Sequence, residues 1–130
     1  MDVVSKAAAE FGECNIGVLP EFMRGLESPC LTEVEWTSTM SSRKEGMRRG
    51  ATVAIALPGG VGTLDELFET MVLVKLSRMD CKVVAYDVDG FWKPLEDLLD
   101  HLVKTGMLSP ADRDILHVVD SIEALGELLK

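Results

Sequence analysis

Three glycines stand within four residues where a short apolar run ends. The run is Ala54–Leu57, and the loop P-G-G-V-G at 58–62 follows it before the helical spacing of apolar residues begins at Thr63. Glycines let backbone N–H groups approach an anion, and they take positive φ where a turn needs it. The first N–H groups of a helix have no partner inside it and carry the positive end of its dipole. The stretch therefore predicts a phosphate seat formed by Gly59, Gly60, Gly62 and Thr63.

The loop favours a monophosphate over larger phosphate ligands. No G-K-[ST] follows its glycines, so it is not a Walker-type triphosphate loop, and Gly60–Asp65 lacks the third glycine of the dinucleotide fingerprint. The alternative is a plain tight turn, in which the glycines only let strand and helix pack. We favour the anion seat because open α/β sheets bind ligands at the carboxyl ends of their strands.

Acidic side chains follow the loop at once. Residues 63–66, T-L-D-E, fit a capping box in which a threonine and a glutamate close the start of a helix. Glu66 therefore has two interpretations. It caps the helix, or it takes part in chemistry on the ligand whose anionic group binds at the loop. Carboxylates at Asp65, Glu66 and Glu69 would repel one another there, so the chemical interpretation requires a cation.

An arginine upstream can supply that charge. In the expected helix Met40–Arg49, Arg43 stands three residues after Met40 and four before Met47, which places it on the apolar side. An arginine there either extends its head to water or pairs with an anion. Exposure to water explains the other basic residues of this helix: Lys44, Arg48 and Arg49.

Short apolar runs alternate along the chain with segments of helical period, which is typical of a parallel sheet covered by helices. Two of these runs, Thr52–Leu57 and Lys82–Tyr86, are almost wholly apolar, which predicts central strands buried on both faces. The five expected strands are Asn15–Pro20, Glu33–Thr37, Thr52–Leu57, Lys82–Tyr86 and Ile115–Val119.

The helical segments lie between these runs. The first has an apolar stripe that ends at Phe11, and Thr63–Arg78 is apolar around more than one face. Part of that longer helix is therefore expected to be covered by a second subunit, or alternatively by Phe91–Lys104. The expected helices are Val3–Phe11 ending at Gly12, Met40–Arg49 ending at Gly50, Thr63–Arg78, Phe91–Lys104, and Ser121–Leu129 capped by Asp120 or Ser121.

This order of elements predicts an α/β fold. We expect one Rossmann-like domain over residues 1–130, with an open parallel sheet and helices on both faces. Such sheets open with a strand and a glycine-rich turn, whereas this chain opens in a helix. We therefore expect it to be N-terminally incomplete and to lack its first βαβ unit.

The composition excludes several classes of function. The 13 Lys and Arg against 22 Asp and Glu give a net charge of −9, which disfavours nucleic-acid binding. No apolar run approaches the roughly 18 residues that cross a membrane. Cys14, Cys30 and Cys81 are widely spaced, so neither a disulfide framework nor a zinc site is expected, and a reducing cytoplasm fits best. His101 and His117 have no ligand partners at metal-binding spacing, so no metal is expected.

Two motifs taken together resemble the Lonely Guy family of phosphoribohydrolases, often labelled lysine decarboxylase-like. They are M-x-x-R-K-x-x-M at Met40–Met47 and P-G-G-x-G-T-x-x-E at Pro58–Glu66, with the turn D-G-F-W at Asp89–Trp92 further along. The resemblance runs from Met1 to the C-terminus. It implies a Rossmann-like homodimer that hydrolyses the N-glycosidic bond of a nucleoside 5′-monophosphate, a cytokinin riboside monophosphate or AMP, to free base and ribose 5-phosphate.

The resemblance also assigns roles to residues of this chain. Arg43 and Glu66 match the catalytic pair of the family, and the glycine loop with Thr63 matches its phosphate-binding loop. Lys44 and Met40 accompany Arg43 in substrate binding, and Glu27 corresponds to a further acidic residue of the site.

The chain departs from the family at several points. Ser41 stands where many members have His, and Val72 stands where some have Thr, which leaves the base specificity open. The expected absence of the opening unit keeps a second interpretation, a non-catalytic binder of nucleotides or phosphosugars. The decarboxylase label finds no support, because the surroundings of the lysines that could form a Schiff base lack the fingerprint of a pyridoxal phosphate site. No cofactor is therefore expected; the lysines considered are Lys6, Lys44, Lys75 and Lys82.

Overall fold

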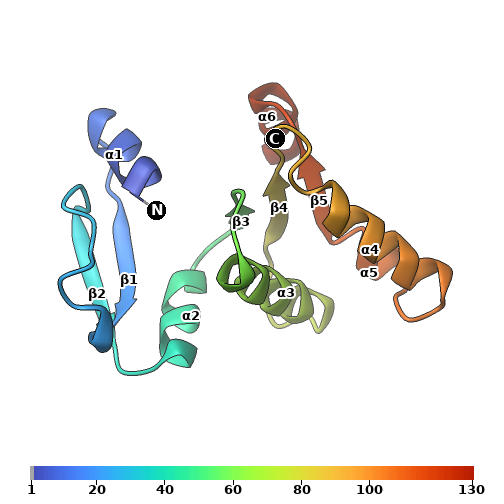
Figure 1. Ribbon diagram of the computed structural model, residues 1–130, viewed down its shortest axis with the longest axis horizontal. Helices are drawn as coiled ribbons and strands as arrows, with labels where there is room; N and C mark the ends of the chain where they lie inside the picture. Colours follow the sequence, from blue (N-terminus) through green and yellow to red (C-terminus); the bar gives the residue numbers. More distant parts are fainter. Residues whose placement is uncertain (1) are drawn as a thin grey trace. The chain divides into compact units, whose positions relative to one another are not determined.

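The computed structural model describes residues 2–130 and shows an α/β chain whose described strands pair in parallel (Figure 1). All five predicted strands are present, which confirms the predicted fold class. Within the described residues they form two separate sheets. The chain divides into two compact units, an N-terminal unit, Met1–Gly50, and a C-terminal unit, Ala51–Lys130. That the whole chain forms one domain stays a prediction.

The N-terminal unit is built on two parallel strands. They pair in register from Ile16 opposite Glu33 to Pro20 opposite Thr37. The first helix of this unit ends before Gly12 (φ 71°), and the second α-helix of this unit ends before Gly50 (φ 72°). Both ends are as predicted, because a left-handed backbone stops a helix. The elements are α1 (Asp2–Glu10), β1 (Ile16–Pro20), the 3-10 helix η1 (Glu21–Met23), β2 (Glu33–Thr37) and α2 (Met40–Arg48).

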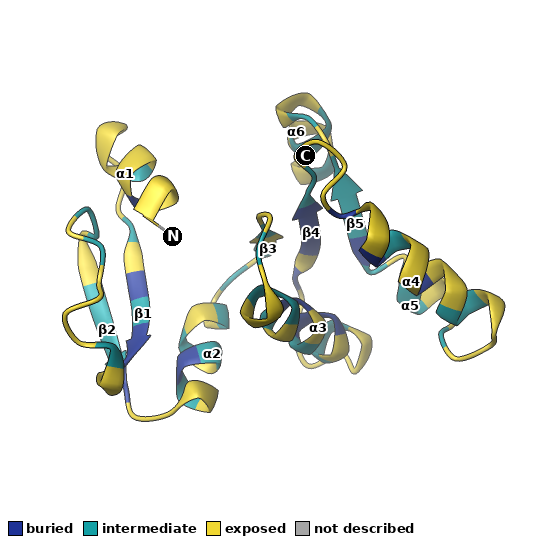
Figure 2. Cartoon of the chain, viewed as in Figure 1, coloured by how far each residue is buried: buried dark blue, intermediate teal, exposed yellow. Residues whose placement is uncertain are grey.

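The apolar stripe of α1 is exposed in this structure (Figure 2). Val3 is 82% exposed, and Phe11, just after the helix, is 84% exposed. Ser5 is the one residue of α1 that is buried among those described. Helical period therefore identified the helix here but not the face that it buries.

The C-terminal unit has a three-stranded parallel sheet in the order β3-β4-β5. The central strand β4 is buried, and Val83, Val84 and Ala85 have no exposed surface. Helices α3 and α4 pack against the face of β4 that carries Val83 and Ala85, and Trp92 lies in the same core. The elements are β3 (Val53–Ala56), α3 (Val61–Lys75), β4 (Lys82–Tyr86), α4 (Lys93–Lys104), α5 (Pro110–Arg113), β5 (Leu116–Val119) and α6 (Ile122–Leu129).

The prediction of two central strands is right for β4 and wrong for β3 in the sheet as described. Among the described strands β3 pairs with β4 alone, and Ile55 is 45% exposed. An apolar run shows that a strand suits a buried place, but strand order depends on pairings far apart in the sequence.

Several helix boundaries also differ from the predicted ones. Helix α3 begins two residues before Thr63, and it ends at Lys75, just ahead of Ser77 with its positive φ of 53°. Helix α4 begins at Lys93 because Phe91 and Trp92 belong to the preceding turn. Helices η1 and α5 were not predicted, since three or four residues are too few to show a period.

Helix α6 starts as predicted behind Ser121, whose Oγ accepts a hydrogen bond from Ala124 N at 3.2 Å. Over residues 2–130, no helix has both the length and the apolar character that crossing a bilayer requires.

Candidate functional site

The predicted phosphate seat forms the start of α3. Gly60 is the N-cap residue (φ −93°, ψ −154°), and the first helical hydrogen bond runs from Leu64 N to Gly60 O at 3.1 Å. Thr63 is thus the third residue inside the helix. The predicted capping box at Thr63–Glu66 is wrong, because Val61 and Gly62 already take helical backbone ahead of the threonine.

Neither the N-cap residue of α3 nor its first turn supplies a side chain that would neutralise the helix start. Gly60 offers none, and the first turn of α3 contains no acidic residue. The first turns of the other helices in this unit each contain one: Glu96 in α4, Asp112 in α5 and Glu123 in α6. The positive end of the α3 dipole is therefore not neutralised from its own first turn, which suits an anionic ligand.

The glycines of the loop are needed because they lack a β-carbon, and not because their backbone is left-handed. None of Gly59, Gly60 and Gly62 has positive φ, so the turn does not require it at these positions. A β-carbon on Gly59 would lie 2.2 Å from Oγ1 of Thr63, so the loop folds tightly onto that side chain. A β-carbon on Gly60 or Gly62 would meet nothing within 4 Å. Gly59 lets the loop close on Thr63, and the other two leave open space over the helix start.

Glu66 lies on the same helix, two residues past the first hydrogen-bonded turn. Its side chain is half-buried, and its carbonyl accepts a hydrogen bond of 2.7 Å from Oγ1 of the buried Thr70. Its neighbours along the helix differ, since Asp65 is exposed and Glu69 is half-buried. The glycine loop and Glu66 thus belong to one structural element of the C-terminal unit.

Arg43 belongs to the N-terminal unit, on α2. It is the one buried residue described on that helix, with 8% of its surface exposed, and its Nε donates to Val18 O in β1 at 3.1 Å. The burial agrees with its predicted place on the packed side of the helix. Met40 and Met47, which defined that side in the sequence, remain 45% and 39% exposed.

The other predicted residues of the N-terminal unit lie nearer the surface. The prediction of exposed basic side chains is confirmed for Arg49, which is exposed and pairs with Glu35 at 3.3 Å. It is not confirmed for Lys44 and Arg48, which are half-buried. Glu27 is exposed, and its Oε2 accepts a hydrogen bond of 2.6 Å from Gly25 N.

An arginine that sequence reasoning missed lies close to Glu27 in the chain. Arg24 bonds to Glu21 through Nε at 2.5 Å and Nη2 at 2.9 Å, and its guanidinium stands 4.3 Å from the ring centre of Trp36. The hydrogen bond from Arg24 lowers the pKa of the Glu21 carboxyl. The i, i+3 spacing of the two charges was the available signal.

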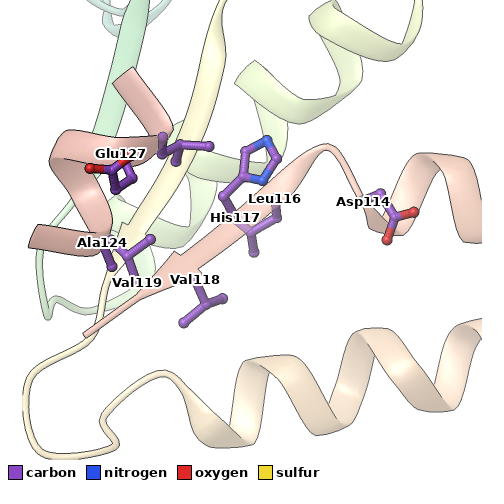
Figure 3. A pocket seen from close by; sticks show the side chains of 8 residues that line it. Asp114, Leu116, His117, Val118, Val119, Ala124 and Glu127 are labelled. Carbon is purple, nitrogen blue, oxygen red and sulfur yellow. The ribbon is translucent and has the colours of Figure 1, made fainter. Parts of the chain in front are cut away.

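A groove of about 650 Å³ lies along β5 and α6 (Figure 3). His117 on β5, Glu127 on α6 and Asp114 before β5 are among its lining residues. It contains none of the predicted site residues. Within residues 2–130, no group of three or more His, Cys, Asp or Glu side chains is placed to hold a metal ion.

Comparison with known proteins shows which family carries the glycine loop at the start of α3 and the basic helix α2. The pattern of the family described as "Possible lysine decarboxylase" matches residues 1–129. The chain belongs to this family. Relatives of this family member are named cytokinin riboside 5′-monophosphate phosphoribohydrolase.

Three relatives illustrate the similarity. A probable phosphoribohydrolase of this name from Oryza sativa subsp. japonica is 36% identical over all of this chain and 54% of its own length. One from Arabidopsis thaliana is 36% identical over 89% of this chain and 55% of its own. One from Mycobacterium tuberculosis is 37% identical over 95% of this chain and 67% of its own. The chain thus spans about half to two thirds of the length of these relatives.

Proposed function

We propose that this family member hydrolyses the N-glycosidic bond of a nucleoside 5′-monophosphate and releases free base and ribose 5-phosphate. The observation that carries the proposal is the start of α3, with its glycine N-cap, its acid-free first turn and the open space at Gly60 and Gly62. The names of the relatives support a cytokinin riboside monophosphate as substrate. AMP is the second substrate that we propose.

The 5′-phosphate binds at the first backbone N–H groups of α3. Each charge-assisted hydrogen bond there contributes about 1.5–3 kcal/mol, enough to orient the attached ribose. Thr63 supports the seat through its contact with Gly59 and offers a hydroxyl beside it. Glycine at 60 and 62 keeps β-carbons out of the space that the phosphate needs.

The reaction passes through a ribose with oxocarbenium character. The bond between C1′ and the base nitrogen breaks, water forms the new bond to C1′, and a proton of that water goes to the departing base. Glu66 stabilises the positive sugar or orients the water, since it is the first half-buried carboxylate after the seat on α3. Arg43 binds the anionic substrate or assists the leaving base, and Lys44, Met40 and Glu27 contribute to substrate binding.

A base-release assay tests the proposal. AMP and isopentenyladenosine monophosphate are incubated with the wild-type chain and with Glu66→Gln and Arg43→Ala, and free base is measured. Each variant is expected to lose at least about 100-fold in rate, the usual range for removing a group that acts in acid–base catalysis. Glu123→Gln on α6 and the exposed Arg78→Ala are matched controls, expected to keep the wild-type rate.

Wild-type rates in Glu66→Gln or Arg43→Ala would contradict these assignments. If calorimetry detects AMP binding but no base is released over hours, the chain is a nucleotide binder rather than a hydrolase. Ser41, which stands where many family members have His, favours this second candidate function, a binder that does not hydrolyse the nucleotide.

We further propose that the chain forms a homodimer through α3. Phe68, Val72 and Leu76 follow one another at four-residue spacing and are 36%, 51% and 57% exposed, and Val61 is 85% exposed on the same helix. A surface of this kind is expected to be covered by a second copy. Sedimentation is expected to show a dimer for the wild type and a monomer for Val72→Glu. A monomeric wild type at high concentration would overturn this proposal.

A further inference from the structure

Helix α2 lies close against the two-stranded sheet at Gly46. A β-carbon there would lie 2.9 Å from Cγ1 of Val18 and 3.2 Å from Oε1 of Glu35. Non-bonded carbon atoms settle at about 3.5–4.0 Å, so a side chain fits at this position only if a neighbour or the helix moves. The backbone of Gly46 does not have positive φ, so the reason for glycine here is space alone.

The two neighbours of Gly46 differ in how easily they can yield. Glu35 is a flexible side chain, held by its ion pair with Arg49 at 3.3 Å. Val18 is β-branched and sits inside β1, in register with Glu35, so its methyl group cannot turn away freely. Val18 therefore sets the depth at which α2 lies.

The same residue receives the side chain of Arg43. Arg43 precedes Gly46 by three positions, which places the two on one side of the helix. Its Nε donates to Val18 O at 3.1 Å. One residue of β1 thus contacts α2 twice, through a methyl group under Gly46 and through a carbonyl at Arg43.

The carbonyl of Val18 points away from β2. Along a strand of a parallel pair, alternate residues turn both backbone polar groups to the same neighbour. Asn15 O accepts from Thr32 N at 2.9 Å and Leu19 O accepts from Thr37 Oγ1 at 3.3 Å, so the odd-numbered carbonyls of β1 face β2. Val18 O therefore needs a donor from outside the ladder, and Arg43 supplies it.

We propose that Gly46 is a positioning residue for Arg43. The missing side chain lets α2 lie at the depth at which Nε of Arg43 reaches Val18 O, and this bond fixes the guanidinium. The catalytic consequence rests on the proposed function, whereas the geometric one does not. A side chain at position 46 lifts the helix on Val18, breaks the bond and displaces the guanidinium of Arg43.

The experiment compares Gly46→Ala, Val18→Ala and the double variant. Val18→Ala removes the colliding methyl group but keeps the carbonyl, so the double variant restores the space. Gly126→Ala is the matched control, because Gly126 also lies in a helix, α6, and a β-carbon there would meet nothing within 4 Å.

The first measurement is hydrogen exchange of the Arg43 Nε–H group, followed by nuclear magnetic resonance and assigned with Arg43→Lys. Gly46→Ala is expected to speed this exchange at least about tenfold, the loss of one charge-assisted bond, and the double variant to restore it. Val18→Ala and Gly126→Ala are expected to exchange like the wild type. Wild-type exchange in Gly46→Ala would overturn the proposal, as would a double variant that stays fast.

The second measurement is base release. Gly46→Ala is expected to lower kcat at least about tenfold, with recovery in the double variant and unchanged kinetics in Gly126→Ala. If Gly46→Ala does not fold, the double variant decides, since a folded chain with a slowly exchanging Arg43 supports the proposal and an unfolded one overturns it. If the exchange pattern is as expected but even the wild type releases no base, the proposed function fails and the positioning role of Gly46 stands.

Discussion

Helices α2 and α3 begin in opposite ways. At α2, Thr39 Oγ1 accepts from Ser42 N at 3.0 Å and Ser42 Oγ accepts from Thr39 N at 3.1 Å, a reciprocal capping box. At α3, the N-cap is Gly60, which has no side chain to accept a bond from the helix. The start of α2 is capped by its own side chains, whereas the N-cap residue of α3 provides no side-chain cap.

The difference separates a structural helix start from one suited to bind a ligand. Replacing a good N-cap side chain by glycine costs a few tenths of a kcal/mol, so the choice at Gly60 sacrifices little stability. It leaves the positive end of α3 accessible to a phosphate. The closed start of α2 instead fixes the first turn of the helix that carries Arg43.

The largest effect is expected from closing the open start. Gly60→Asp adds a good capping side chain and a negative charge where the phosphate is proposed to bind. AMP affinity is expected to fall at least about 100-fold, because several bonds of about 1.5–3 kcal/mol are lost. Thermal stability is expected to stay level or rise slightly. Calorimetry and thermal unfolding measure the two quantities.

Thr39→Asp is the matched control, since it replaces one capping side chain by another at α2 and is expected to leave AMP affinity unchanged. Wild-type AMP affinity in Gly60→Asp would remove the basis for calling the start of α3 a ligand site.

The next largest effect distinguishes the glycines of the loop from one another. Gly59→Ala collides with Thr63 and is expected to destabilise the chain by about 1–3 kcal/mol, the usual cost of overpacking, with loss of AMP affinity. Gly62→Ala meets no neighbour and is expected to stabilise the helix by up to about 1 kcal/mol while still lowering AMP affinity. Unfolding curves and calorimetry on both variants test this, and identical behaviour would contradict the separate roles.

The sequence predicts which segments form strands and helices better than it predicts where the helices of the site begin. The alternation of apolar runs and helical periods identified all five strands, because both periods are local properties. The T-x-x-E pattern at Thr63 predicts a helix start that the structure places at Gly60 instead, because a capping motif does not show which residue begins the helix. The true capping box at Thr39 has serine in place of glutamate and was not recognised.

Contacts between segments far apart in the chain could not be predicted from the sequence. Helical spacing predicted that Arg43 lies on the packed side of α2, but its partner, the carbonyl of Val18, follows from the register of β1 on β2. The place of β3 at the edge of the described β3-β4-β5 sheet depends in the same way on which strands pair. The reason for Gly46 likewise appears only when α2 lies on Val18.

A moderate effect is expected from opening the closed start. Thr39→Ala removes the acceptor for Ser42 N and is expected to destabilise the chain by about 1 kcal/mol. AMP affinity of the folded chain is expected not to change, since the cap holds the backbone and not the ligand. Denaturant unfolding and calorimetry check the two expectations. A drop in affinity larger than the unfolded fraction explains would mean that the two helix starts are not independent.

The smallest effect is expected at the other end of α3. Lys75, in its last turn, bonds to Asp112 at 2.8 Å, and this bond, with a second from Ser109, lowers the pKa of the Asp112 carboxyl. Because that pKa lies below the unfolded value of about 3.9, the interaction stabilises the chain above this pH. Its contribution is lost as the pH falls through the lowered pKa.

Asp112→Asn is therefore expected to lower Tm slightly at neutral pH, less in high salt, and not at all in strong acid. AMP affinity is expected to match the wild type, because the dipole acts on a ligand through the first turn of a helix and falls off beyond it. Thermal unfolding across the pH range and AMP calorimetry measure both. A Tm difference that persists in acid would show that Asp112 acts through packing and not charge. A change in affinity would show that the open start of α3 depends on how its far end is held.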